Sequence, residues 1–192
     1  GKIPTNLFAS SSNRRILRAM PVSVPVEKIH EYLAASLTKV FETMAKADCK
    51  FLGNEAYEGK QAFSPKIDPD KDPSTRIFAS SVGFAGEVNG VCYLFMGDLF
   101  AKTASHKITG LSMEDLDDEV VRDVCGELTN MFAGTFKNCL ADLGLPSTLT
   151  VPTVVQGKRM AISTAGTADQ YRFNFEVDGF PVFADLLLSD RN

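Results

Sequence analysis

The sequence predicts an α+β fold in which long helices pack against an antiparallel sheet of hairpins. Segments with helical periodicity precede and separate segments with strand periodicity, and three glycine-containing pairs stand where hairpin turns are expected. The 192 residues, of which 44% are hydrophobic and 23% charged, are typical of one globular domain. We therefore expect one domain over residues 26–192, after an N-terminal extension over residues 1–25 that has no sustained period.

The first helix is expected to start at Pro25 and to end near Ala47. Proline suits the first turn of a helix, where its missing N–H is not needed. The apolar residues that follow recur at helical spacing: Ile29, Leu33, Leu37, Val40, Phe41 and Met44. A short strand at residues 49–52 is expected next.

A polar insertion over about residues 54–75 follows this strand. Alternate aspartates from Asp68 to Asp72 imitate the start of a calcium-binding loop. Pro73 and Ala79, however, occupy the positions that require a glycine and a bidentate carboxylate. The insertion is therefore expected to be a solvated loop.

Three hairpins are expected from turn chemistry. An Asn-Gly pair favours the type I′ turn, whose twist matches that of the flanking strands. The turn pairs and the strands that they would join are Asn89-Gly90 between 76–88 and 91–96, Gln156-Gly157 between 149–155 and 159–164, and Asp178-Gly179 between 171–177 and 180–188.

Two helices are expected between the first hairpin and the other two, over about residues 98–108 and 113–143. Ser112 would cap the second of them, and acids at 114–119 complement the positive end of its dipole, so no metal is needed to explain them. One arc of this helix is apolar and should face the core: Val121, Val124, Cys125, Leu128, Phe132, Cys139 and Leu143.

The opposite side of this long helix carries Asp123, Glu127, Asn130, Gly134 and Lys137. Glu127 and Asn130, three residues apart, should stand side by side in water. A glycine inside an exposed helix costs about 1 kcal/mol relative to alanine. Gly134 therefore suggests that another molecule approaches the helix closely, although solvated residues alone would also fit this pattern.

Composition excludes several classes of protein. Twenty Lys and Arg against 24 Asp and Glu give a formal charge of −4 and a pI near 5.2, which argues against nucleic-acid binding. No apolar run has the roughly 18 residues needed to span a bilayer, so a cytoplasmic protein is expected. The four cysteines are too dispersed for a metal or redox motif, and two histidines cannot form a three-histidine metal site.

The segment Cys125-Gly126-Glu127-Leu128-Thr129-Asn130-Met131-Phe132-Ala133-Gly134-Thr135-Phe136-Lys137 resembles the signature helix of the CheX and CheC family of chemotaxis phosphatases. Residues 94–97 and 149–157 are similar to the strands of that family around its central helices, and 40–44 to the end of its opening helix. CheC-type members carry a second Glu-x-x-Asn in the first helix. Here Ala34 and Ala45 stand where that asparagine would follow Glu31 and Glu42, so the single site resembles that of CheX.

The resemblance implies an antiparallel sheet packed on long helices and hydrolysis of the aspartyl phosphate of a CheY-like response regulator. Asn130 would position the attacking water, and Glu127 would pair with the active-site lysine of the regulator. Asp123, Met131, Gly134 and Lys137 would contact this partner. Mg²⁺ is expected on the regulator, and this chain would bind no cofactor or metal of its own.

Two further expectations accompany the resemblance. The chain would form a homodimer, with residues 180–188 offering an apolar strand edge in which Pro181 stands at an edge or strand start. The alternative function is a non-catalytic docking domain of the same fold that binds a signalling or flagellar partner.

Overall fold

The computed structural model describes residues 25–57, 70, 72–158, 160 and 169–189. The predicted extension over residues 1–25 lies outside these residues except for Pro25. Within the described ranges the chain forms three helices and seven strands, in the order α1 Val26–Met44, β1 Cys49–Tyr57, β2 Ile77–Gly86, β3 Asn89–Gly97, α2 Asp98–Thr109, α3 Asp118–Asp142, β4 Ser147–Leu149, β5 Thr153–Gly157, β6 Asp169–Val177 and β7 Phe180–Ser189.

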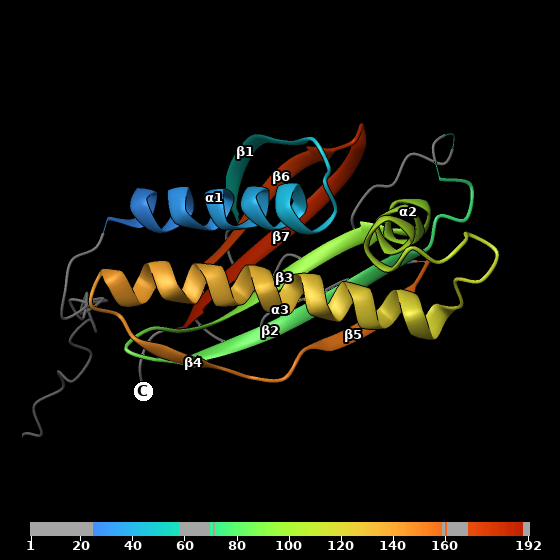
Figure 1. Ribbon diagram of the computed structural model, residues 1–192. Helices are drawn as coiled ribbons and strands as arrows, with labels where there is room; N and C mark the ends of the chain where they lie inside the picture. The colour runs from blue at the N-terminus through green and yellow to red at the C-terminus, as the bar shows by residue number, and fades with distance from the viewer. Residues whose placement is uncertain (1–24, 58–69, 71, 159, 161–168, 190–192) are drawn as a thin grey trace, which may run out of the picture.

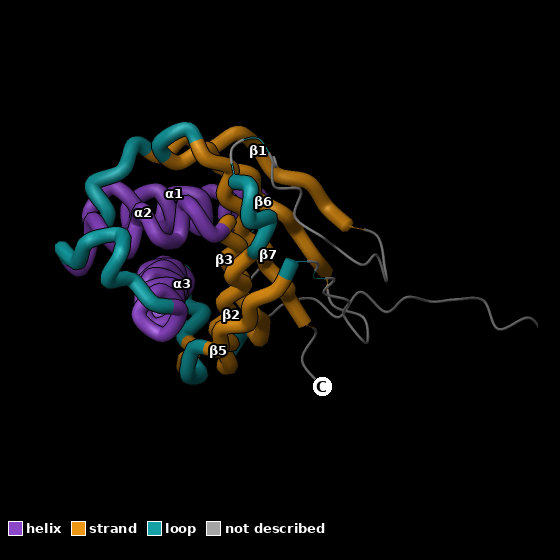
Figure 2. The backbone as a smooth tube through the Cα atoms, turned by 90° about the vertical axis from the view of Figure 1, so that its right-hand side faces the viewer, coloured by secondary structure: helices purple, strands orange, loops and turns teal. Residues whose placement is uncertain are grey.

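The strands form one antiparallel sheet in the order β1-β6-β7-β3-β2-β4, and β5 also pairs with β2. All three helices cover the same face of this sheet, with α1 and α3 running alongside one another (Figures 1 and 2). The predicted α+β class is therefore confirmed. Among the described helices, none combines the length and the apolar character that a membrane span requires.

The core lies between the helices and the sheet. Alternate residues of each central strand point toward the helices, so Leu94 on β3 and Ala184 on β7 are buried against Leu33 and Phe132 of α1 and α3. The opposite face of the sheet holds a smaller apolar cluster around Phe95. Both faces of the central strands thus carry buried apolar side chains.

The first helix matches the prediction closely, with Pro25 as its N-cap and Met44 as its last residue. The strand after it is longer than expected. β1 continues to Tyr57 with a bulge at Leu52, between Phe51 and Gly53, so residues 54–57 pair with β6 instead of starting the polar insertion. Most of the predicted loop, at 58–69 and 71, lies outside the described residues.

The first and third predicted hairpins form, and the turn of the third is as expected. Asp178 and Gly179 both have positive φ angles, of 49° and 81°, as a type I′ turn requires. The first turn, in contrast, lies two residues earlier than predicted, at residues 87 and 88, because Asn89 and Gly90 already belong to β3. Asn89 accepts a hydrogen bond from the backbone N–H of Gly86 across the turn.

Gly90 is required by packing and not by a turn. A Cβ at this position would lie 2.2 Å from the carbonyl oxygen of Leu187 and 2.5 Å from the ring of Phe84. The second predicted turn is also wrong, because Gln156 and Gly157 are the last residues of β5, which pairs with β2. Its second strand, expected at 159–164, falls outside the described residues except for Met160.

The C-terminal strand is not the edge that the sequence suggested. β7 lies between β6 and β3 and pairs with both, which explains why its apolar residues are buried. Pro181 stands at the start of the strand, before the pairing with β3 begins at Val182. β1 forms one edge of the described sheet, and it exposes Phe51 and Leu52.

The long helix begins later than predicted. Asp117 is its N-cap and accepts a hydrogen bond from the N–H of Val120 at 2.9 Å, whereas Ser112 pairs with Asp115 in the preceding turn. The predicted core arc holds as far as Phe132. Further on, the buried positions are Phe136 and Leu140, while Cys139 and Leu143 are half-buried, because this part of the helix packs on β2 through Phe136, whose ring centroid lies 6.0 Å from that of Phe84.

Three of the four cysteines are buried, and none forms a disulfide. Cys92 and Cys125 lie in the main core, where burial raises the pKa of each thiol, that of Cys125 to about 12. A thiol that stays protonated at neutral pH is a poor nucleophile and a poor metal ligand. Both residues therefore act as small apolar core residues, as predicted.

Candidate functional site

The candidate site is a short stretch of the outer face of α3. Glu127 is exposed and Asn130 is half-buried, and their three-residue spacing places them about one helical turn apart on neighbouring surface positions. The position of this face follows from the core. Val124, three residues before Glu127, and Leu128, directly after it, are buried on the side of the helix that faces the core. The carboxylate of Glu127 must therefore point outward.

Four other residues were predicted to contact a partner from this face. Asp123 is exposed one turn before Glu127, while Met131 and Gly134 are half-buried beside Asn130. These residues form one continuous surface with the central pair. Lys137 is half-buried and lies ten residues after Glu127, or about 15 Å along the helix axis, so it stands at the far end of this surface.

The side chains of Glu127 and Asn130 form no hydrogen bond or ion pair with any residue in the described ranges. This sets them apart from the acids at the start of the same helix. There, Asp117 caps the helix and Asp118 is paired with Arg76. A carboxylate and an amide without internal partners are available to bind something outside the chain.

Packing among the described residues does not require a glycine at position 134. A Cβ added at Gly134 would have only the Cδ1 of Leu149 nearby within these residues, at an ordinary contact distance of 3.9 Å. The helix would be about 1 kcal/mol more stable with alanine in place of glycine. The absence of an internal reason for this glycine favours an external one, which is the close approach of another molecule.

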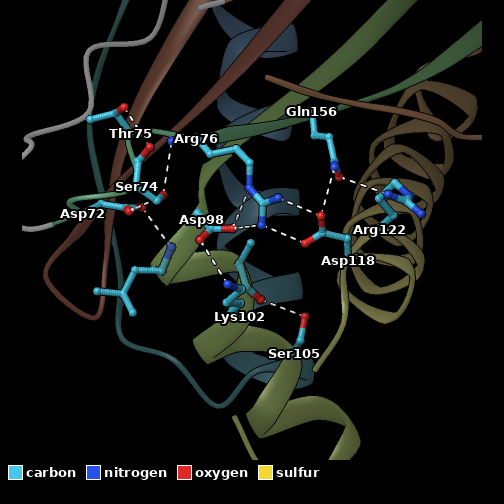
Figure 3. Close-up of polar contacts among 12 residues, drawn as sticks. Asp72, Ser74, Thr75, Arg76, Asp98, Lys102, Ser105, Asp118, Arg122 and Gln156 are labelled. Carbon is cyan, nitrogen blue, oxygen red and sulfur yellow. Dashed lines mark hydrogen bonds and ion pairs between the residues drawn. The ribbon is translucent and has the colours of Figure 1, made fainter. Parts of the chain in front are cut away.

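A polar network that the sequence did not reveal holds the start of α3 in place (Figure 3). Arg76, just before β2, donates two hydrogen bonds to Asp118 at 2.7 Å and two to Asp98, the first residue of α2, at 2.5 and 3.0 Å. The guanidinium holds the pKa of Asp118 below its usual range. Arg76 therefore joins the N-termini of two helices to the sheet.

The β5 side of the sheet supports the same helix end. Gln156 donates to Asp118 at 3.1 Å and accepts from Arg122 at 3.2 Å (Figure 3). The residues of this network come from α2, α3, β5 and the segment just before β2, and Arg76 lies 22 and 42 positions from its two aspartates. No local sequence pattern points to such a cluster.

Within the part of the chain that the structure describes, no three His, Cys, Asp or Glu side chains lie close enough together to hold a metal ion. Glu127 and Asn130 themselves offer one carboxylate and one amide. Such a pair can orient a water molecule and form an ion pair with a cation.

Comparison with known proteins gives a consistent picture. The family described as chemotaxis phosphatase CheX matches residues 78–176, from the second residue of β2 to the next-to-last residue of β6. The chain is 34% identical over 133 residues to the CheY-P phosphatase CheX of Thermotoga maritima. This aligned stretch covers 69% of this chain and 79% of that protein.

Solved structures share the fold. A chemotaxis protein CheX from Desulfovibrio desulfuricans superposes with a TM-score of 0.71 at 19% identity, covering 84% of this chain and 99% of the other. CheX of Borrelia burgdorferi, in a complex with CheY, BeF₃ and Mg²⁺, gives a TM-score of 0.59 at 22% identity over 84% of this chain and 98% of the other.

Proposed function

The chain belongs to the chemotaxis phosphatase CheX family, and on that premise we propose that it hydrolyses the aspartyl phosphate of a CheY-like response regulator. The relative from Thermotoga maritima is a CheY-P phosphatase, and the relative from Borrelia burgdorferi forms a complex with CheY. The observation that carries the proposal to particular residues is that Glu127 and Asn130, on the outer face of α3, have no hydrogen-bond or ion-pair partner among the described residues.

The reaction needs little chemistry from this chain. An acyl phosphate is already activated, and Mg²⁺ bound by the regulator would neutralise the phosphoryl oxygens. Water attacks the phosphorus, the bond from phosphorus to the aspartyl oxygen breaks, and the products are inorganic phosphate and the free carboxylate. What remains to be supplied is the position of the water.

Asn130 supplies this position. Its amide oxygen accepts a hydrogen bond from the water and thereby aligns the water oxygen with the phosphorus, while the amide is too weak a base to remove a proton. Its half-buried state supports this role, because contact with the helix surface restricts the side-chain conformation before the partner arrives.

Glu127 aligns the two proteins. It is exposed and unpaired within the described chain, so it can form a charge-assisted hydrogen bond with the active-site lysine of the regulator. Asp123, Met131, Gly134 and Lys137 would lie around this contact, and Gly134 would let the regulator approach the helix backbone. We place the reaction in the cytoplasm.

The substitution Asn130→Ala tests the proposal, with Asn138→Ala as its matched control. Asn138 is exposed on the same helix, eight residues or about 12 Å further along the axis. Both changes should leave the fold stable, because alanine is the better helix former. Asn130→Ala should slow phosphate release about a hundredfold, equivalent to about 2.7 kcal/mol of transition-state stabilisation, and Asn138→Ala should not.

The assay measures phosphate release from phosphorylated CheY-like regulators of the source organism, at regulator concentrations that saturate each variant. Equal rates for the wild type and Asn130→Ala, with a regulator that both bind, would contradict the catalytic role. The alternative of a non-catalytic docking domain would then be correct.

A further inference from the structure

The connection between β4 and β5 runs along the candidate site. Gly126, Asn130 and Gly134 are spaced by four residues and so lie in one line along α3. A Cβ at Gly126 would lie 3.7 Å from the Cβ of Pro152, and a Cβ at Gly134 would lie 3.9 Å from Leu149. Both ends of the line therefore face this connection.

The similar lengths of the helical line and of the connection between β4 and β5 place one residue pair of that connection beside Asn130. The eight residues from Gly126 to Gly134 span about 12 Å along the helix, and the extended chain from Leu149 to Pro152 spans about 10 Å. Asn130 is the midpoint of the helical line. The midpoint of the connection is the pair Thr150 and Val151.

These two residues have different roles. Thr150 fastens the connection to β2: its N–H donates to the carbonyl oxygen of Gly83 at 2.8 Å, and its Oγ1 accepts from the N–H of Gly83 at 2.8 Å. Val151, in contrast, is 82% exposed, the most exposed of the large apolar residues in the described chain. An immobilised backbone thus holds an apolar side chain in water beside the site.

We infer that Val151 is a recognition residue, which packs against the apolar surface of the phosphorylated regulator when α3 docks at the phosphoryl group. This inference rests on the proposed function. The connection suits an apolar contact, because no residue from 147 to 157 carries a charge. Its backbone is already ordered by hydrogen bonds to β2, so little conformational freedom is lost on binding.

The binding role of Val151 and the catalytic role of Asn130 can be distinguished by kinetics. Val151 has no group that can orient a water or bind a lysine, so it contributes to binding alone, while the amide acts on the bound complex. A change at Val151 should therefore raise KM and leave kcat unchanged. A change at Asn130 should lower kcat.

The test is Val151→Asp, with Val155→Asp as its matched control. Val155 is also apolar and 54% exposed, but it lies on β5, where it pairs with Ala79 of β2, beyond the stretch from Leu149 to Pro152 that runs along α3. Both substitutions place the same charge on the same segment without disturbing a buried group. Val151→Leu keeps an apolar side chain and should restore binding.

The partner for this test is the CheY-like regulator that the wild type binds most tightly when the regulator is loaded with beryllofluoride and Mg²⁺. For Val151→Asp we expect a Kd for this complex, and a KM for the phosphorylated regulator, at least tenfold higher than for the wild type, with kcat within twofold. Val155→Asp and Val151→Leu should stay within threefold of the wild type.

Two results would overturn the inference: a Kd for Val151→Asp within twofold of the wild type, or an equal loss for Val155→Asp. Failure of the proposed function has a different signature. If Asn130→Ala released phosphate as fast as the wild type while Val151→Asp still weakened binding, the catalytic role would fall and the recognition role would stand. A wild-type chain that bound none of the loaded regulators would overturn both.

Discussion

Replacing Arg76 tests whether one guanidinium holds the helix layer onto the sheet. Arg76→Met keeps most of the side-chain stem and removes four hydrogen bonds, two to Asp98 and two to Asp118. The two aspartates differ in exposure, with side chains that are 9% and 39% exposed. The loss of Arg76 should therefore cost unequal amounts at the two sites.

Asp98 accounts for most of the cost. It is nearly buried, and without Arg76 it keeps one cation, Lys102, at 3.2 Å and the favourable end of the α2 dipole. Losing charge-assisted hydrogen bonds at such a site costs about 2 kcal/mol. Asp118 becomes solvated again, which costs at most about 1 kcal/mol.

The free energy of unfolding should therefore fall by about 3 kcal/mol, the sum of these two contributions. For a chain of this size the melting temperature should fall by about 6–12 °C. The matched control is Arg122→Met, which removes a single hydrogen bond to Gln156 and should cost less than about 1 kcal/mol.

Urea titration of the wild type and the variants measures these differences. A double-mutant cycle should give a larger coupling energy for Arg76 with Asp98 than for Arg76 with Asp118, with asparagine as the replacement in each case. Equal destabilisation by Arg76→Met and Arg122→Met would refute the reasoning. A larger coupling with the more exposed aspartate would refute the argument from burial.

Three further predictions concern stability and assembly. Burial against Tyr171 and Phe173 lowers the pKa of His30 below its usual 6.5. The unfolded chain therefore takes up this proton first, and stability falls as the pH drops below about 6.5. His30→Gln should flatten the urea-measured stability between about pH 7 and 5, and an unchanged pH dependence would contradict this reasoning. Gly90→Ala should lower the free energy of unfolding by about 3 kcal/mol, because the alanine Cβ would collide with β7. A free energy of unfolding within about 0.5 kcal/mol of the wild type, which is about the error of the measurement, would disprove that packing. We expect a homodimer, with the exposed edge at β1 as the strand that pairs; light scattering that gave a monomer mass over a wide concentration range would contradict it.

Much of the fold was predictable because helices and strands impose their own periods on a sequence. Pro25 and the apolar spacing after it predicted α1, and Asp178-Gly179 predicted the turn between β6 and β7. The placement of Glu127 and Asn130 on one helix face follows from the helical period alone, given a core on the other side. These features depend on residues a few positions apart, and local steric preferences act over that range.

The order of the strands and the contacts between distant residues were decided only by tertiary structure. The apolar pattern of β7 fits an edge or a central strand, and its pairing with both β6 and β3 settles which it is. Gly90 follows an asparagine, as glycine does in many turns, but glycine is required here by the close approach of β7. Arg76 reaches its aspartates across long stretches of chain, and the connection between β4 and β5 meets α3 at Gly126 and Gly134. A one-dimensional pattern records which way a side chain points within its own element, whereas these pairings depend on which elements minimise the free energy of the whole chain when they pack together.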